Sequence, residues 1–98
     1  MKELKKGNKI ISKNVIISEG VRNLMGEQFH YSTSINNMIH AYLNGDFGRI
    51  SKSVENNNLK NFELNTGLVN AEYTLDNYIV KIDTNLDDSV TTLSLYGE

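Results

Sequence analysis

GLVNAEYTL at residues 67–75 and YIVKIDT at residues 78–84 decide the fold of this chain. In both segments apolar and polar residues alternate, which is the pattern of half-buried β-strands. Asp76 and Asn77, the two residues between the segments, are typical of a tight hairpin turn. After a second polar turn, SVTTLSLY at residues 89–96 alternates in the same way. Together the three segments predict an antiparallel meander of short strands.

The clearest predicted helix precedes the meander and runs from about residue 34 to residue 44. Its apolar residues recur at helical spacing and form one stripe: Ile35, Met38, Ile39, Tyr42 and Leu43. Thr33 or Ser34 is expected to cap its start, which leaves residues 29–31 in a loop. Gly45 is expected to end it in a left-handed conformation.

Three other segments give weaker structural signals. A short helix is predicted to begin at Ser18, whose hydroxyl can accept a hydrogen bond from an early backbone N–H. Residues 51–61 are polar and rich in asparagine, and they predict a short helical turn followed by a loop. The apolar runs at residues 9–11 and 15–17 indicate two short strands or one irregular edge strand. We therefore expect an α+β fold in which two or three short helices pack on an antiparallel sheet that ends in the meander.

Length and composition predict a single domain over residues 1–98, with residues 1–8 as a basic arm that could be flexible. The chain has no cysteine, which excludes a disulfide framework and a thiolate metal site. It contains no apolar run of the roughly 20 residues that a membrane helix needs. The N-terminus lacks the apolar stretch of a secretory signal, so we expect a cytoplasmic protein without membrane contact.

The formal net charge of −2 conceals an asymmetry along the chain. Residues 1–22 contain six cations and two carboxylates, which gives +4, whereas residues 63–98 contain seven carboxylates and one lysine, which gives −6. A basic arm can contact phosphate groups, and an acidic sheet can contact a basic groove of another protein.

Motifs that resemble catalytic or metal sites lack the residues that would complete them. DFG at residues 46–48 matches the magnesium-binding tripeptide of protein kinases, but no glycine-rich loop or catalytic loop accompanies it. Residues 83–87 have the alternating oxygen spacing of a calcium loop without its glycine and its final glutamate. His30 and His40 have no carboxylate or nucleophile at a suitable spacing. The sequence predicts no catalytic residue, no cofactor and no metal site, and hence a protein that is not an enzyme.

Several short stretches match a known family in order and spacing: LNGDFG at residues 43–48, Glu55-Asn56, LVNAEY at residues 68–73, Thr84 with Asp87, and SVTTL at residues 89–93. They resemble small plasmid- and phage-borne proteins that are often mislabelled as a type I restriction endonuclease subunit M or as a plasmid-related protein. The pattern of that family is a GDWG turn after a helix, an acidic stretch containing asparagine, an LLSAY strand and a final SVTT strand.

This chain departs from the family pattern at three positions. Tyr42 stands where the family tends to have histidine, and Phe47 and Lys81 stand where it has tryptophan. The resemblance implies a compact α+β domain encoded on mobile DNA. It does not imply methyltransferase activity, because so short a chain cannot hold a doubly wound cofactor-binding sheet and a catalytic loop.

From the missing catalytic groups, the acidic sheet and the resemblance, we expect a non-enzymatic binding protein of a phage or mobile element. It would act in the cytosol of a bacterial host as an anti-defence inhibitor, similar to an anti-CRISPR protein. It would block a CRISPR or restriction complex by protein–protein contact. The candidate partner-binding residues are acidic side chains of the last third and one tyrosine: Glu72, Asp76, Asp83, Asp87, Asp88 and Tyr96. Reversing Asp87 and Asp88 to lysine is expected to leave folding intact and to slow association.

Two other functions remain open at this point. The chain could be a sponge for a nucleotide signal, with Arg22, Arg49, Phe29 and Tyr31 as pocket residues, or an accessory DNA-binding protein using Lys2, Lys5, Lys6 and Lys9. Val90 and Tyr96 are expected on a sheet face opposite the main helix. That face could meet a partner or a second copy in a homodimer, or it could be covered by an N-terminal strand or helix.

Overall fold

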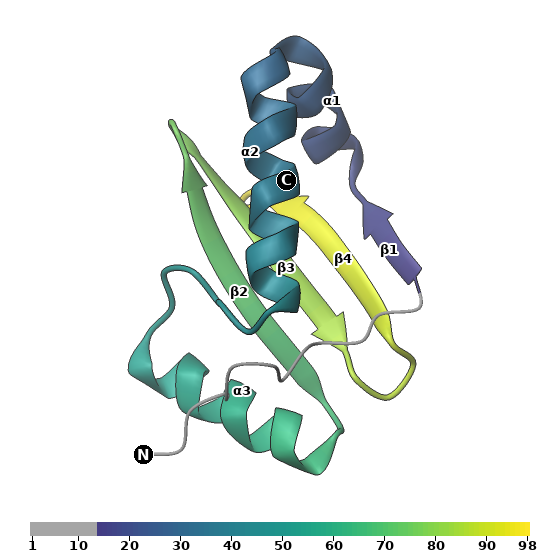
Figure 1. Cartoon of the computed structure of the whole chain (residues 1–98), viewed down its shortest axis with the longest axis vertical. Coiled ribbons are helices and arrows are strands. Elements are labelled where there is room, and N and C mark those ends of the chain that lie inside the picture. The colour runs from purple at the N-terminus through teal and green to yellow at the C-terminus, as the bar shows by residue number, and fades with distance from the viewer. Residues whose placement is uncertain (1–13) are drawn as a thin grey trace.

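A four-stranded sheet with a long helix across one face forms the centre of the molecule (Figure 1). The computed structural model describes residues 14–98. In chain order the elements are β1 (Asn14–Ile17), α1 (Glu19–Glu27), α2 (Phe29–Leu43), α3 (Lys52–Leu64), β2 (Leu68–Leu75), β3 (Tyr78–Asn85) and β4 (Val90–Leu95). The order of the strands across the sheet is β1-β4-β3-β2. The expected α+β class is confirmed.

The predicted meander is present, but the sheet is mixed rather than wholly antiparallel. β2 pairs with β3 and β3 with β4 in antiparallel register. β1 pairs with β4 in parallel, with Ile16 opposite Thr92. Parallel neighbours need a long crossover connection, and here α1, α2, α3, β2 and β3 all lie between the two strands in sequence. The apolar run at residues 9–11 and the basic arm lie outside the described residues.

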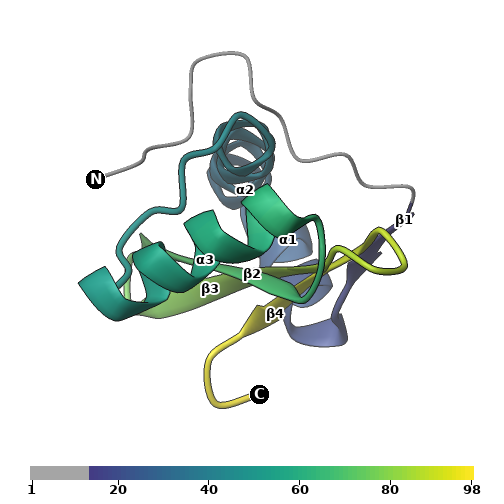
Figure 2. The ribbon, with the colours of Figure 1, turned by 90° about the horizontal axis from the view of Figure 1, so that it is seen from below.

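The hydrophobic core lies between α2 and the sheet face that it covers (Figure 2). Five aliphatic side chains of the sheet are fully buried there: Val69, Ala71, Val80, Ile82 and Leu93. Ile35 and Tyr42 of α2 are fully buried against them. The Tyr42 hydroxyl lies 2.5 Å from Thr84 Oγ1, and that oxygen lies 2.7 Å from Thr91 Oγ1. Because all three oxygens are buried, this chain of hydrogen bonds fixes α2 in one position on the sheet.

The helix starts were predicted with mixed success. α1 begins as expected, because Ser18 Oγ accepts a hydrogen bond from Val21 N. The predicted start of α2 at residue 33 or 34 is wrong: the helix begins at Phe29, and Gln28 at its N-cap makes no side-chain capping bond. Tyr31 is buried one turn before Ile35 and its hydroxyl donates to Asp76, so tertiary contacts stabilise this extra turn.

Each helix in residues 14–98 is too short or too polar to cross a membrane.

α3 is a full helix along the outer edge of β2, where the sequence predicted only a helical turn and a loop (Figure 1). Asn58 is fully buried; its Nδ2 donates to Asn70 O at 2.7 Å and its Oδ1 accepts from Asn70 N at 2.9 Å. Asn61 Nδ2 donates to Leu68 O at 2.8 Å. The asparagines therefore pair with backbone groups that a fifth strand would otherwise use.

The loop between α2 and α3 closes the remainder of that edge. Phe47 O accepts a hydrogen bond from Glu72 N at 3.2 Å, and Arg49 N donates to Glu72 O at 2.7 Å. The outward-facing backbone of β2 is thus paired along most of its length. Both α3 and the loop before it therefore serve to pair backbone groups of β2 that would otherwise have no hydrogen-bond partner within the sheet.

Candidate functional site

In residues 14–98, no helix packs across the centre of the sheet face opposite α2. We call this face the open face. Its side chains come from alternate positions of the four strands: Ile16, Leu68, Asn70, Glu72, Thr74, Ile79, Lys81, Asp83, Asn85, Val90, Thr92 and Ser94. All of them keep some contact with solvent. Figure 2 shows α2 on the other side of the sheet.

Large apolar side chains stand at the margins of the open face. Ile16 on β1 is 52% exposed, Leu68 on β2 is 50% exposed and Ile79 on β3 is 39% exposed. Tyr96, just beyond β4, is 70% exposed, and Val90 is partly exposed. The expectation that Tyr96 is exposed is therefore confirmed. β1 extends the sheet at its edge and does not cover this face.

The centre of the open face is polar and carries both signs of charge. Glu72 lies directly opposite Lys81 on the neighbouring strand. Asp83 lies between Asn70 on β2 and Thr92 on β4. Burial raises the pKa of the Asp83 carboxyl above its ordinary value; Lys81 opposes this shift and Glu72 adds to it. A half-buried carboxylate of this kind gains most from a partner that supplies a hydrogen bond or a positive charge.

A groove of about 350 Å³ lies where the start of α3 meets the open face. Its lining combines cations, carboxylates and apolar groups: Arg49, Ile50, Ser51, Val54, Asn70, Ala71, Glu72, Lys81 and Asp83. Arg49 is placed there by its backbone bond to Glu72 O, so the closure of the β2 edge also brings a guanidinium beside the face. The mixture of charges can pair with polar groups of a protein surface without favouring one sign.

The predicted acidic set does not form one patch, because the sheet separates its members. Glu72 and Asp83 lie on the open face. Asp76 lies in the β2–β3 turn at one end of the sheet, where it accepts a hydrogen bond from the Tyr31 hydroxyl at 2.7 Å. This bond is the main cause that raises the pKa of Tyr31 to about 12. Asp76 therefore has a structural contact with α2.

Asp87 and Asp88 lie in the β3–β4 turn at the opposite end of the sheet, and both support the backbone. Asp87 Oδ1 accepts from the Thr66 hydroxyl at 2.6 Å, and its Oδ2 accepts from Gly67 N at 3.3 Å. Asp88 Oδ1 accepts from Val90 N at 3.1 Å. Because lysine cannot accept these hydrogen bonds, reversing both charges would disturb the turn, and the expectation of intact folding is not supported by this geometry.

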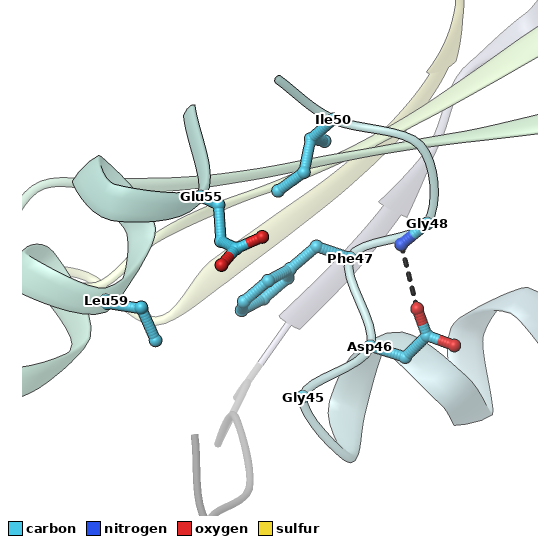
Figure 3. Close-up of a pocket in the computed structure, with 7 residues that line it drawn as sticks. All are labelled: Gly45, Asp46, Phe47, Gly48, Ile50, Glu55 and Leu59. Atoms are coloured by element: carbon cyan, nitrogen blue, oxygen red, sulfur yellow. Dashed lines mark hydrogen bonds between the residues drawn. The ribbon is translucent and has the colours of Figure 1, made fainter. Parts of the chain in front are cut away.

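The GDFG stretch of the family resemblance builds the turn between α2 and α3 (Figure 3). Asp46 Oδ1 accepts a hydrogen bond from Gly48 N at 2.9 Å. The Phe47 ring is 8% exposed and points toward Glu55 and Leu59 of α3, at a depression of about 310 Å³. Gly48 has φ +67°, and a Cβ there would lie 2.1 Å from Glu72 O. The motif therefore contributes to backbone closure and core packing.

The other motif positions are also structural. Tyr42, one of the positions at which the chain departs from the pattern that it resembles, packs edge-on against Phe47 with ring centroids 6.2 Å apart. Thr91 of the SVTT strand is buried and bonded to Thr84. Within the motif, Thr92 faces the open side of the sheet. The residues that carry the resemblance thus mostly maintain the fold.

The residues expected to form a nucleotide pocket do not converge on one site in residues 14–98. Arg22 lies on α1, where its Nε donates to Ile17 O, and Arg49 lies beside β2. Phe29 is 89% exposed on α2, whereas Tyr31 is buried and bonded to Asp76. Lys2, Lys5, Lys6 and Lys9 lie outside the described residues. Within residues 14–98 there is no group of three histidine, aspartate or glutamate side chains placed to hold a metal ion.

Comparison with known proteins found no protein-family model, no curated protein and no solved structure that matches this chain.

Proposed function

We propose that this chain is a binding protein, not an enzyme, and that it acts by placing its open face on the surface of another protein. The observation that carries the proposal is the contrast between the two faces of the sheet. The centre of one face is covered by α2 and its aliphatic side chains are buried there, whereas the other face exposes Ile16, Leu68, Ile79 and Tyr96 around a polar centre. Apolar side chains combined with paired polar groups are typical of protein interfaces.

The position of the titratable groups supports binding over catalysis. Both histidines lie on α2, which packs on the opposite side of the sheet from Glu72 and Asp83. In the groove at this face, carboxylates and the cationic residues Lys81 and Arg49 therefore line one site without an imidazole. Such an arrangement supplies complementary charges to a partner.

For the partner we propose a host defence complex in the bacterial cytosol, and for the protein an anti-defence role on a phage or mobile element. The support is the resemblance of residues 43–48 and 89–93 to small phage- and plasmid-borne proteins. A small protein that covers a functional surface of such a complex can inhibit it by steric exclusion alone. The proposal thus names a surface on this chain and a class of target.

The proposal is tested by the transformation efficiency of a targeted plasmid in cells that carry an active CRISPR or restriction system, with and without this protein. We expect rescue of the plasmid in one type of system. Thr92→Arg, which places a long cation in the centre of the open face, is expected to abolish that rescue. Thr92 is partly exposed, so the variant can fold.

The matched control is Asn36→Arg, which adds the same side chain to an exposed position on α2. It is expected to rescue as well as the wild type. Equal rescue by the Thr92→Arg variant, with both variants folded by circular dichroism, would show that the open face is not used. A lack of rescue in every system would exclude the defence complex as the target.

A further inference from the structure

An apolar groove borders the open face at the end where β3 begins and β4 ends. It has a volume of about 340 Å³, and we call it the tyrosine groove; its lining residues are Asn77, Tyr78, Ile79, Leu95, Tyr96, Gly97 and Glu98. We propose that this groove is the anchor point of the interface and takes an apolar side chain that is flanked by basic residues on the partner protein. This inference rests on the proposed function and adds the chemistry of the partner.

The walls of the tyrosine groove are exposed, apolar and held in place. Tyr78 is 38% exposed, Ile79 is 39% exposed and Tyr96 is 70% exposed. Tyr96 N donates to Ile79 O at 3.0 Å, which fixes the backbone positions that carry these two walls relative to each other. The Tyr78 ring packs edge-on against Tyr31, whose hydroxyl is bonded to Asp76. Such preorganised aromatic walls lower the entropic cost of binding an inserted side chain.

Two carboxylates lie at the groove, which favours basic flanks on the partner. Glu98 lines it, and Asp76 lies in the adjoining β2–β3 turn next to the lining residue Asn77. Asp76 and Glu98 are fixed by hydrogen bonds from Tyr31 and from Ser18 respectively. These bonds hold the negative charge in position, so a cationic neighbour of the inserted side chain meets it at short range.

The test uses a peptide with one leucine between two pairs of lysines, titrated into the full-length isotope-labelled protein and followed by amide chemical shifts. We expect saturable shifts at Ile79, Tyr96 and Gly97. Replacing the lysines by glutamates is expected to weaken binding at least about tenfold, and replacing the leucine by glycine to remove it. No host complex is present, so this experiment does not depend on the identity of the target.

Tyr96→Ala is expected to remove the peptide response, and its exposed position makes unfolding improbable as a cause. Phe29→Ala, which removes an even more exposed aromatic ring from α2, is the matched control and is expected to leave the response unchanged.

Shifts confined to other residues, or equal binding of the glutamate peptide, would overturn the inference. Shifts at the same amides that depend on protein concentration without peptide would also overturn it, because a second copy would then be the occupant. Loss of rescue by Thr92→Arg in the absence of peptide binding would reject the groove and keep the open face.

Discussion

At the scale of single residues, Asn58 shows how a polar side chain can serve as a structural core residue. Its amide makes two hydrogen bonds to Asn70, one as donor and one as acceptor, in a fully buried position. A carboxamide presents the same donor and acceptor pair as a peptide group, so Asn58 substitutes for a residue of a neighbouring strand. Its short side chain spans the distance from α3 to the edge of β2.

We expect Asn58→Ala to lower the free energy of unfolding by about 2–4 kcal/mol, because both backbone groups of Asn70 lose their buried partner. The measurement is urea unfolding followed by circular dichroism. Asn57→Ala removes the same group from the exposed preceding position, and a change within about 0.5 kcal/mol is expected. Similar costs for the two variants would refute the role given to Asn58.

Glu98 is the second residue whose role only the structure reveals. Its Oε1 accepts from Ser18 Oγ at 2.7 Å and from Leu95 N at 2.9 Å, and its Oε2 accepts from Gly20 N at 2.9 Å. These hydrogen bonds, from Leu95 first, lower the pKa of the Glu98 carboxyl. The carboxylate thereby joins the end of the sheet to the positive end of α1.

The lowered pKa predicts a pH-dependent contribution to stability. The unfolded chain has an ordinary glutamate pKa of about 4.3, so the stabilisation is complete above that value and is lost as the pH falls through the lower pKa of the folded state. Glu98→Gln is therefore expected to reduce the Tm at neutral pH and to have little effect in acid. Gly20→Ala should abolish the same pH dependence, since its Cβ would lie 2.8 Å from the Glu98 carboxyl carbon. A wild-type and Glu98→Gln difference in Tm that is constant with pH would contradict this role.

At the scale of elements, hydrophobic periodicity predicted the meander and most of α2, and it failed for α3. The strands of the meander alternate cleanly because one face packs on α2 and the other meets solvent. α3 buries an asparagine and lies along a strand edge, so it lacks the apolar stripe that identifies a helix. The extra turn of α2 depends on Tyr31, whose partner Asp76 is far away in sequence. Both misses come from tertiary contacts that a local pattern does not contain.

The turn before α3 gives an element-level prediction. Gly48→Ala is expected to cost at least about 2 kcal/mol of stability, because its φ of +67° strains an alanine and its Cβ would meet Glu72 O. Gly26→Ala in α1 is the opposite case: a Cβ there meets no atom within 4 Å, and we expect a gain of about 0.5–1 kcal/mol. Thermal unfolding of the two variants measures both effects. A stable Gly48→Ala variant would show that the turn tolerates rearrangement.

At the scale of the whole molecule, the sequence predicted a second sheet face opposite the main helix, but it left open whether that face is covered and did not predict its composition. Strand alternation placed Glu72, Asp83 and Tyr96 correctly as surface residues, and overall charge suggested one acidic surface. The strand register places Glu72 and Asp83 in a central row that also contains Lys81. The other carboxylates of the predicted set lie in the two turns of the meander. Arg49 was not assigned to this face, because its position depends on the backbone bond that closes the β2 edge. Although the last third of the sequence is acidic, the folded sheet therefore presents a face that carries both signs of charge and is bordered by an apolar groove.

Photo-crosslinking inside host cells tests the open face most directly. A photoreactive residue is placed either at Thr92 on the open face or at Asn36 on α2, in cells whose defence system the protein blocks. We expect crosslinks from position 92 to a subunit of that defence complex, and none from position 36. Crosslinks from position 36 alone, or blocking of defence without any crosslink from position 92, would contradict the account.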